Sequence, residues 1–261
     1  MNPHKDKNPY KAPKEHPIIH YANGEPVPNK HQVTYLGIEI HQKGNQQPNL
    51  ITRLAKAQKE FEKLKIFWNH ANLTKIWKLR VFKAIFYPMI LYGLHHSCLT
   101  QTNLDKLDAW QARQLRRVLK IKASFYSRTP NSTVIKQADT PLLSAIVLRN
   151  QIQYLGRILR AENYETIKTI TLTRHCNYRT LTARRRRGHP RDHWLPTLVE
   201  DIHDTLATLP PSHSLPHPAI TLSPFPYAAL SQLAADSTHW RRVSELPTRR
   251  FTTPQHTPTA L

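Results

Sequence analysis

The sequence predicts a mainly α-helical protein with a small antiparallel β-hairpin near its N-terminus. From Asn49 onward, apolar residues recur at spacings of three and four, which is typical of amphipathic helices. The first 31 residues instead contain six prolines, which disfavour helix, and the dipeptide Asn23-Gly24, which is a hairpin signal. We therefore expect an antiparallel β piece near residues 17–42, followed by a helical bundle.

Three long helices are predicted between residues 49 and 122. The first has an apolar face that we expect in the core, formed by Leu54, Ala57, Phe61, Leu64 and Trp68. The second has a face of Ile76, Leu79, Phe82, Phe86 and Met89; Pro88 predicts a kink or an earlier end, and Tyr92-Gly93 a stop. The third is expected to begin after Thr102-Asn103, as N-cap residues, and to end near Ile121.

The second half of the chain alternates helix and irregular structure. After Thr129-Pro130 we expect a short helix to Ala138 and then a longer one from Pro141, which contains Gly156. Residues 205–235 contain no Asp, Glu, Lys or Arg, and six prolines between 210 and 226 predict a linker. An amphipathic piece at 227–246 is expected to dock on the body, before a disordered tail at 247–261.

The charge of the chain indicates a phosphate-rich partner. Lys and Arg outnumber Asp and Glu by 38 to 17, and the net charge is +21. Neither a run of about 20 apolar residues nor a signal peptide is apparent, so we expect no membrane segment and a location in the nucleus or cytoplasm. The two cysteines, Cys98 and Cys176, support no disulfide framework.

The positive charge is concentrated where a binding surface would need it. Residues 53–122 contain 15 Lys and Arg against four acids. Two helical rows are candidates for tracking phosphates, with a merely solvated face as the alternative: Arg53, Lys56, Lys59 and Lys63, and Arg113, Arg116, Arg117 and Lys120. The run Arg184-Arg185-Arg186-Arg187 could grip phosphates, act as a nuclear address or simply be solvated.

Aromatic and metal-ligating residues give weaker signals. Trp77, Trp110, Tyr126 and Trp194 have cationic neighbours and could stack on bases, although Trp110, like Trp68, fits a core position equally well. His95, His96, Cys98, His175 and Cys176 match no standard zinc spacing. Glu200, Asp201, His203 and Asp204 are better explained as a solvated helix face, so no metal site is predicted.

Several segments resemble the reverse transcriptases of non-LTR (LINE-type) retrotransposons. Asn2, Pro3, Lys5 and Lys7 match a Leu-Asn-Pro-x-Lys-Thr-Lys segment that follows the catalytic turn in that family, although Asp6 replaces the Thr. A strand, the Asn23-Gly24 turn and a second strand ending in Tyr35-Leu36-Gly37 follow in the family's order. Further matches lie at residues 91–93, 115–119, 154–160, 188–194 (which includes Arg191) and 233–242.

The resemblance implies a C-terminal part of such an enzyme. Residues 1–48 would be the last palm strands with the primer-grip-like hairpin Tyr35-Leu36-Gly37, 49–125 a basic helical thumb, and 126–204 a distal basic region. Lys5 would be the lysine of the post-catalytic motif. The catalytic carboxylates would lie upstream, so we expect no polymerase activity and no cofactor on this chain alone, with magnesium needed only by the intact parent enzyme.

The partner implied is an RNA, DNA or RNA/DNA primer-template, and another chain could supply the missing palm. Two alternatives stay open at this point. The chain could be a stand-alone basic nucleic-acid-binding protein derived from a decayed element. It could also be a remnant without function, which a cooperative unfolding transition would argue against.

Overall fold

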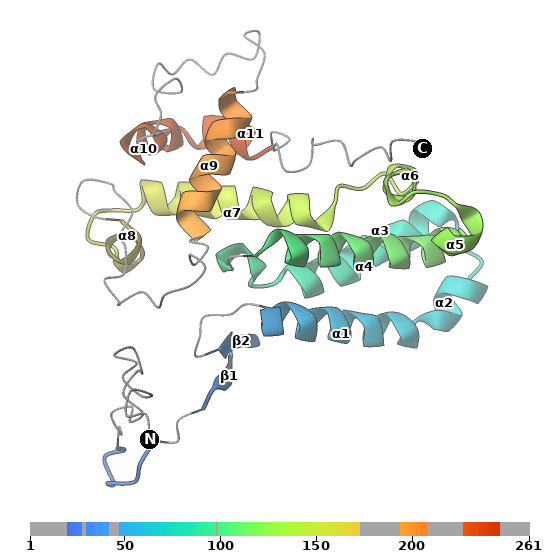
Figure 1. Ribbon diagram of the computed structural model, residues 1–261, viewed down its shortest axis with the longest axis horizontal. Helices are drawn as coiled ribbons and strands as arrows, with labels where there is room; N and C mark the ends of the chain where they lie inside the picture. The colour runs from blue at the N-terminus through green and yellow to red at the C-terminus, as the bar shows by residue number, and fades with distance from the viewer. Residues whose placement is uncertain are drawn as a thin grey trace, which may run out of the picture.

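The computed structural model describes residues 20–27, 30–41, 47–97, 99–172, 194–207 and 227–245, and 71% of these are helical. The predicted fold class is confirmed, since a mainly helical chain carries a small N-terminal antiparallel sheet (Figure 1). The predictions for Lys5, the 184–187 arginine run, Arg191, most of the 205–226 linker and the tail lie outside the described residues.

The sheet is a hairpin of two short strands. β1 (Gln32–Tyr35) pairs antiparallel with β2 (Ile38–His41), with Tyr35 opposite Ile38. Residues Leu36 and Gly37 form the turn with φ of 49° and 75°, because a two-residue hairpin turn with positive φ follows the twist of the strands. The strand predicted to end in Tyr35-Leu36-Gly37 therefore ends at Tyr35, and Leu36-Gly37 form the turn into β2. The Asn23-Gly24 turn closes only an isolated bridge between His20 and Pro26.

The first half of the bundle surrounds one aromatic core. Its elements are α1 (Gln47–Lys63), α2 (Lys65–His70), α3 (Lys75–Leu91), the 3-10 turn η1 (Leu94–His96), α4 (Gln101–Leu119), α5 (Ser124–Ser127) and α6 (Asn131–Gln137). Phe61 stacks on Trp68 with ring centroids 5.0 Å apart, and Phe82, Phe86 and Trp110 pack around this pair. The residues predicted for the apolar face of the first helix pack in this core, with Leu54 and Leu64 half-buried. The helix is shorter than predicted, because α1 ends at Lys63 and Trp68 lies on α2.

Two helix boundaries differ from the sequence-based expectation. Thr100 caps α4, since its Oγ1 accepts the Asn103 backbone N–H at 3.4 Å, so the helix begins before the predicted Thr102-Asn103 cap. Pro88 does not end α3, which continues to Leu91. Gly93, with φ of 72°, then ends the segment as expected. At the other end of α3, Ile76 of the predicted apolar face is exposed.

The second half is organised around α7 (Leu143–Arg160). It also contains α8 (Thr166–Thr171), α9 (Trp194–Ala207), α10 (Tyr227–Ala235) and α11 (Ser237–Glu245). In Figure 1, α9 crosses α7, and α10 and α11 lie above α7. Leu143 and Val147 belong to the first core, whereas Leu148 to Leu159 join α9, α10 and α11 in a second core. The boundary between the two cores therefore falls within α7.

The expected docking of residues 227–246 is confirmed, with the segment folded as two helices instead of one. Leu230, Leu233 and Trp240 are buried against α7. None of the helices in the described ranges is long and apolar enough to cross a membrane.

Candidate nucleic-acid interface

Helices α1 and α4 lie side by side and are joined by polar contacts along their outer seam. Gln114 Nε2 donates to Gln58 Oε1 at 2.6 Å. One turn further on, Arg117 donates to both carboxylate oxygens of Glu62, at 2.5 and 2.8 Å. The Arg117 guanidinium also lies 4.7 Å from the centre of the Phe61 ring, which fixes its position over the first core.

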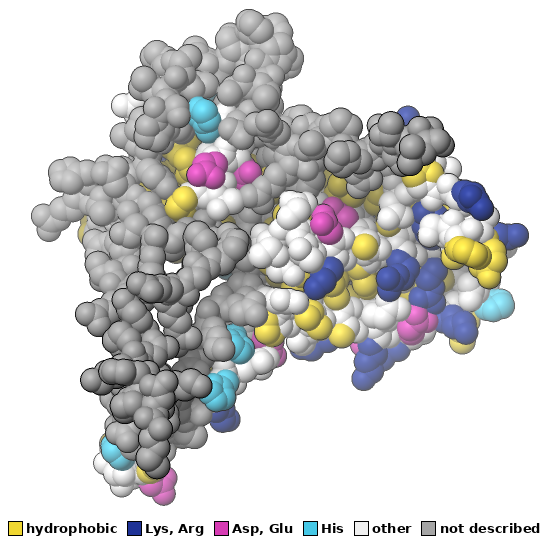
Figure 2. Space-filling view, in the orientation of Figure 1, with side chains coloured by type: hydrophobic (Ala, Val, Ile, Leu, Met, Phe, Trp, Pro, Cys, Tyr) yellow, Lys and Arg dark blue, Asp and Glu magenta, His cyan; other side chains and the backbone are white. Residues whose placement is uncertain are grey.

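Cationic side chains flank this seam on both helices. We call this surface the α1–α4 basic face and define it by Lys56, Lys59 and Lys63 on α1, with Lys106, Arg113, Arg117 and Lys120 on α4. These side chains are exposed, apart from Arg117 in the seam, which is half-buried. Figure 2 shows Lys and Arg side chains gathered over this side of the molecule, with few acidic ones among them.

The electrostatics of the basic face leave a surplus of positive charge. Glu60 pairs with Lys63 at 2.7 Å, Glu62 pairs with Arg117, and the charge of Lys56 acts on Glu39, so among the described residues the seven cations outnumber these three carboxylates. The hydrogen bonds from Arg117 lower the pKa of Glu62 and raise that of Arg117. Since both pairs are at the surface, each contributes about 0 to 1 kcal/mol, and an incoming phosphate can compete for them.

Lys59, Lys106 and Arg113 are exposed and available to a ligand. Among the residues that the structure describes, none of the three makes an ion pair or a side-chain hydrogen bond. Lys120, at the end of α4, donates to the Asn69 carbonyl at 3.2 Å and keeps its other donors exposed. Lys106 was not predicted, although it lies seven residues before Arg113 and fourteen before Lys120, a spacing that places all three on one helical face.

Two residues of the predicted phosphate-tracking rows are buried and hold the protein together instead. Arg53 is 8% exposed and donates to the backbone carbonyls of Gly37 (2.9 Å) and Met89 (3.3 Å). Arg116 is 6% exposed and donates to the Thr129 carbonyl and the Asn131 side chain. Because these donors are committed to the chain's own oxygens, neither arginine belongs to the basic face.

The predicted primer-grip-like residues lie at an exposed edge of the molecule. Tyr35 and Leu36 are exposed, and the turn is tied to the helices by two contacts. Tyr92 Oη donates to the Leu36 carbonyl at 3.0 Å, and Arg53 holds the Gly37 carbonyl while its guanidinium lies 4.9 Å from the Tyr92 ring. The hairpin is thus fixed relative to α1 and α3.

Of the predicted stacking residues, Trp110 is in the core and Trp194 is half-buried beside Tyr154. Trp77 is exposed, with the Arg80 guanidinium 5.0 Å from its ring. Tyr126 is 75% exposed and forms an edge-to-face pair with Phe125, which is 83% exposed and was not predicted. A pair of adjacent aromatics after a basic helix end was the signal that could have identified Phe125.

Among the residues that the structure describes, no group of three or more metal-ligating side chains could hold a metal ion, and the candidates Cys98, His175 and Cys176 lie outside those residues. Comparison with known proteins adds no relative, because no protein-family model, no curated protein and no solved structure matches this chain.

Proposed function

We propose that this chain binds nucleic acid through backbone phosphates, as the thumb-like part of a non-LTR retrotransposon reverse transcriptase. The observation that supports this proposal best is the α1–α4 basic face, where seven cationic side chains from two packed helices outnumber the described carboxylates that they meet. The order of the segments that resemble the family supports the more specific assignment.

The chemistry of the basic face determines how binding would behave. Lys and Arg contact phosphate oxygens irrespective of base sequence, so binding is tolerant of sequence. Each phosphate neutralised releases counterions, and affinity therefore falls steeply as salt rises. The face belongs to two helices whose seam and core are well packed, so its cations are held in fixed rows.

The test compares two double variants of equal charge. Lys59→Gln with Arg113→Gln removes two cations of the basic face, and Lys136→Gln with Arg242→Gln removes two exposed cations on α6 and α11. Binding of each protein to a labelled RNA/DNA hybrid is measured over a salt series. We expect the first variant to reduce the slope of log K against log salt by about 1 to 2 and the control to leave it unchanged.

Two results would count against the proposal. Equal losses in both variants would mean that the net charge, and no particular face, attracts the nucleic acid. Absence of binding by the unaltered chain at low salt would remove the function altogether.

A stand-alone nucleic-acid-binding protein is the second candidate. It is favoured by the packing, since the described helices bury two cores of their own. The same salt series with single-stranded RNA and with duplex DNA discriminates the two candidates. A clear preference for the hybrid supports the primer-template assignment, and equal affinities favour the stand-alone protein.

A further inference from the structure

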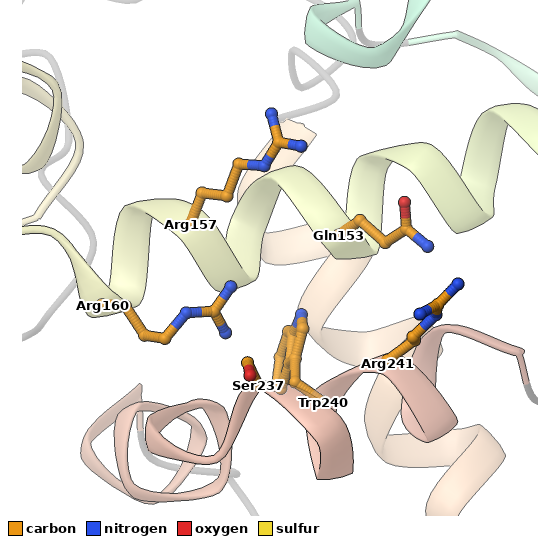
Figure 3. A pocket seen from close by; sticks show the side chains of 6 residues that line it. All are labelled: Gln153, Arg157, Arg160, Ser237, Trp240 and Arg241. Atoms are coloured by element: carbon orange, nitrogen blue, oxygen red, sulfur yellow. The ribbon is translucent and has the colours of Figure 1, made fainter.

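A small open pocket lies between α7 and α11, away from the α1–α4 basic face. Its volume is about 250 Å³, and it is lined by Gln153, Arg157, Arg160, Ser237, Trp240 and Arg241. Figure 3 shows Arg160 of α7 facing Ser237, Trp240 and Arg241 of α11, whereas the side chain of Arg157 extends from the opposite side of α7. This volume is below that of typical sites for drug-sized ligands, so the pocket suits a small chemical group.

The lining consists of hydrogen-bond donors and positive charge. Gln153 and Arg160 lie seven residues apart on α7, which places them on one face of that helix. The lining includes no Asp or Glu. The Gln153 amide and the Ser237 hydroxyl add neutral donors between the guanidinium groups.

The nearest carboxylates are already engaged. Glu245 is held by Arg149 at 2.8 Å, and its distance from Arg241 Nε is longer, at 3.7 Å. Asp236 accepts the backbone N–H groups of Thr238 and His239 at the start of α11. Arg160 donates once to the Ala234 carbonyl at 2.9 Å, and Arg157 makes no ion pair with any residue that the structure describes.

We propose that this pocket binds a phosphate monoester. Guanidinium groups match phosphate oxygens in geometry and can donate two hydrogen bonds at once. A monoester carries about −1.5 to −2 charges near neutral pH, which suits the two arginines Arg160 and Arg241 better than the single charge of a phosphodiester. The site lies outside the proposed α1–α4 interface, so the proposal of phosphate binding does not depend on the function proposed for that interface.

The monoester could be free phosphate or the phosphorylated end of a nucleic-acid strand, and the experiment separates these sources. Binding of inorganic phosphate is measured by equilibrium dialysis at constant ionic strength. Hexathymidylate with a 5′-phosphate and with a 5′-hydroxyl, each labelled at its 3′ end, is measured by fluorescence anisotropy. Competition between inorganic phosphate and the phosphorylated oligonucleotide shows whether both occupy one site.

Arg241→Gln and its neighbour Arg242→Gln form a matched pair, since both residues are exposed on α11 and only Arg241 lines the pocket. We expect Arg241→Gln and Arg160→Gln each to weaken phosphate binding by about tenfold, and Arg242→Gln by less than about twofold. Circular dichroism and a urea midpoint check that each variant is folded.

Preference for the 5′-phosphorylated over the 5′-hydroxyl strand, lost in both pocket variants, would identify a strand end as the ligand. Saturable phosphate binding without competition from that strand would identify a free phosphate ester. The proposal is overturned if the unaltered protein binds no phosphate saturably, or if Arg242→Gln weakens binding as much as Arg241→Gln. Equal binding of the hydroxyl and phosphorylated strands would exclude a strand end as the source of the monoester.

Discussion

The indole of Trp240 lies directly against the backbone of Gly156, so that α11 and α7 approach more closely than any side chain at position 156 would allow. A Cβ at Gly156 would be 2.1 Å from Trp240 Nε1 and 2.8 Å from Cε2. The indole N–H donates to the Ile152 carbonyl at 2.8 Å, one turn before the glycine. This contact fixes α11 on α7 and, with it, the position of Arg241 beside the phosphate pocket.

Gly156→Ala is therefore expected to destabilise the protein. The added methyl group has no space, and overpacking of this kind costs about 1 to 3 kcal/mol. The free energy of unfolding in urea measures the effect. An alanine variant as stable as the unaltered protein would contradict the close contact.

The effect of Gly156→Ala on the free energy of unfolding should change sign when Trp240 is absent. In a Trp240→Ala background the space is empty, and alanine favours helix over glycine by about 1 kcal/mol. Gly156→Ala is then expected to stabilise that background. The comparison is a double-mutant cycle, and additive effects would show that the two residues do not interact.

Arg53 is expected to stabilise the fold and to contribute little to nucleic-acid binding directly. Burial lowers the pKa of its guanidinium, and Arg53→Met would leave the Gly37 and Met89 carbonyls without this donor. We expect a loss of about 2 to 4 kcal/mol in the free energy of unfolding. Lys56→Met on the exposed face of the same helix is the control and should change stability by less than about 0.5 kcal/mol.

Phe125 and Tyr126 are expected to stack on unpaired bases. Both are exposed, and they follow Lys120 and Lys122 at the end of the basic face. Replacing both with Ala should weaken binding of single-stranded RNA by about 1 to 3 kcal/mol per stacked base, with little effect on protein stability. Tyr164→Ala, at an equally exposed tyrosine beyond α7, is the control. Equal losses of affinity in both variants would argue against a stacking site.

His95 and His96 should make stability depend on pH. Burial lowers the pKa of both side chains below 6.5, and the positive charge of Arg157 adds to this effect at His95. Because the unfolded chain then binds more protons, the free energy of unfolding is highest above pH 6.5 and falls as the pH drops through the lowered pKa values.

The measurement is a series of urea titrations between pH 7.5 and pH 5 with the unaltered protein and with His95→Gln combined with His96→Gln. The double variant should lose less stability on acidification. Parallel curves would show that other groups cause the pH dependence.

Much of the helical fold could be predicted because helices leave a local signal. The spacing of Phe61, Trp68, Phe82 and Phe86 in the sequence was sufficient to place them in a core. The hairpin turn was harder to place. Asn23-Gly24 is the stronger local turn signal, but the turn that joins the two paired strands is Leu36-Gly37. The position of Leu36-Gly37 depends on Arg53 and Tyr92, which come from helices further along the chain.

The sequence by itself determined the sign and location of the charge, the helical class and most apolar faces, because composition and periodicity are properties of short segments. Only the tertiary structure decided which cations face solvent. Arg53 and Lys56 occupy one predicted row, yet the first is buried and the second exposed, since burial depends on what packs against each side chain. The pocket also required the fold, because Arg160 and Arg241 line one pocket only after α11 has docked on α7.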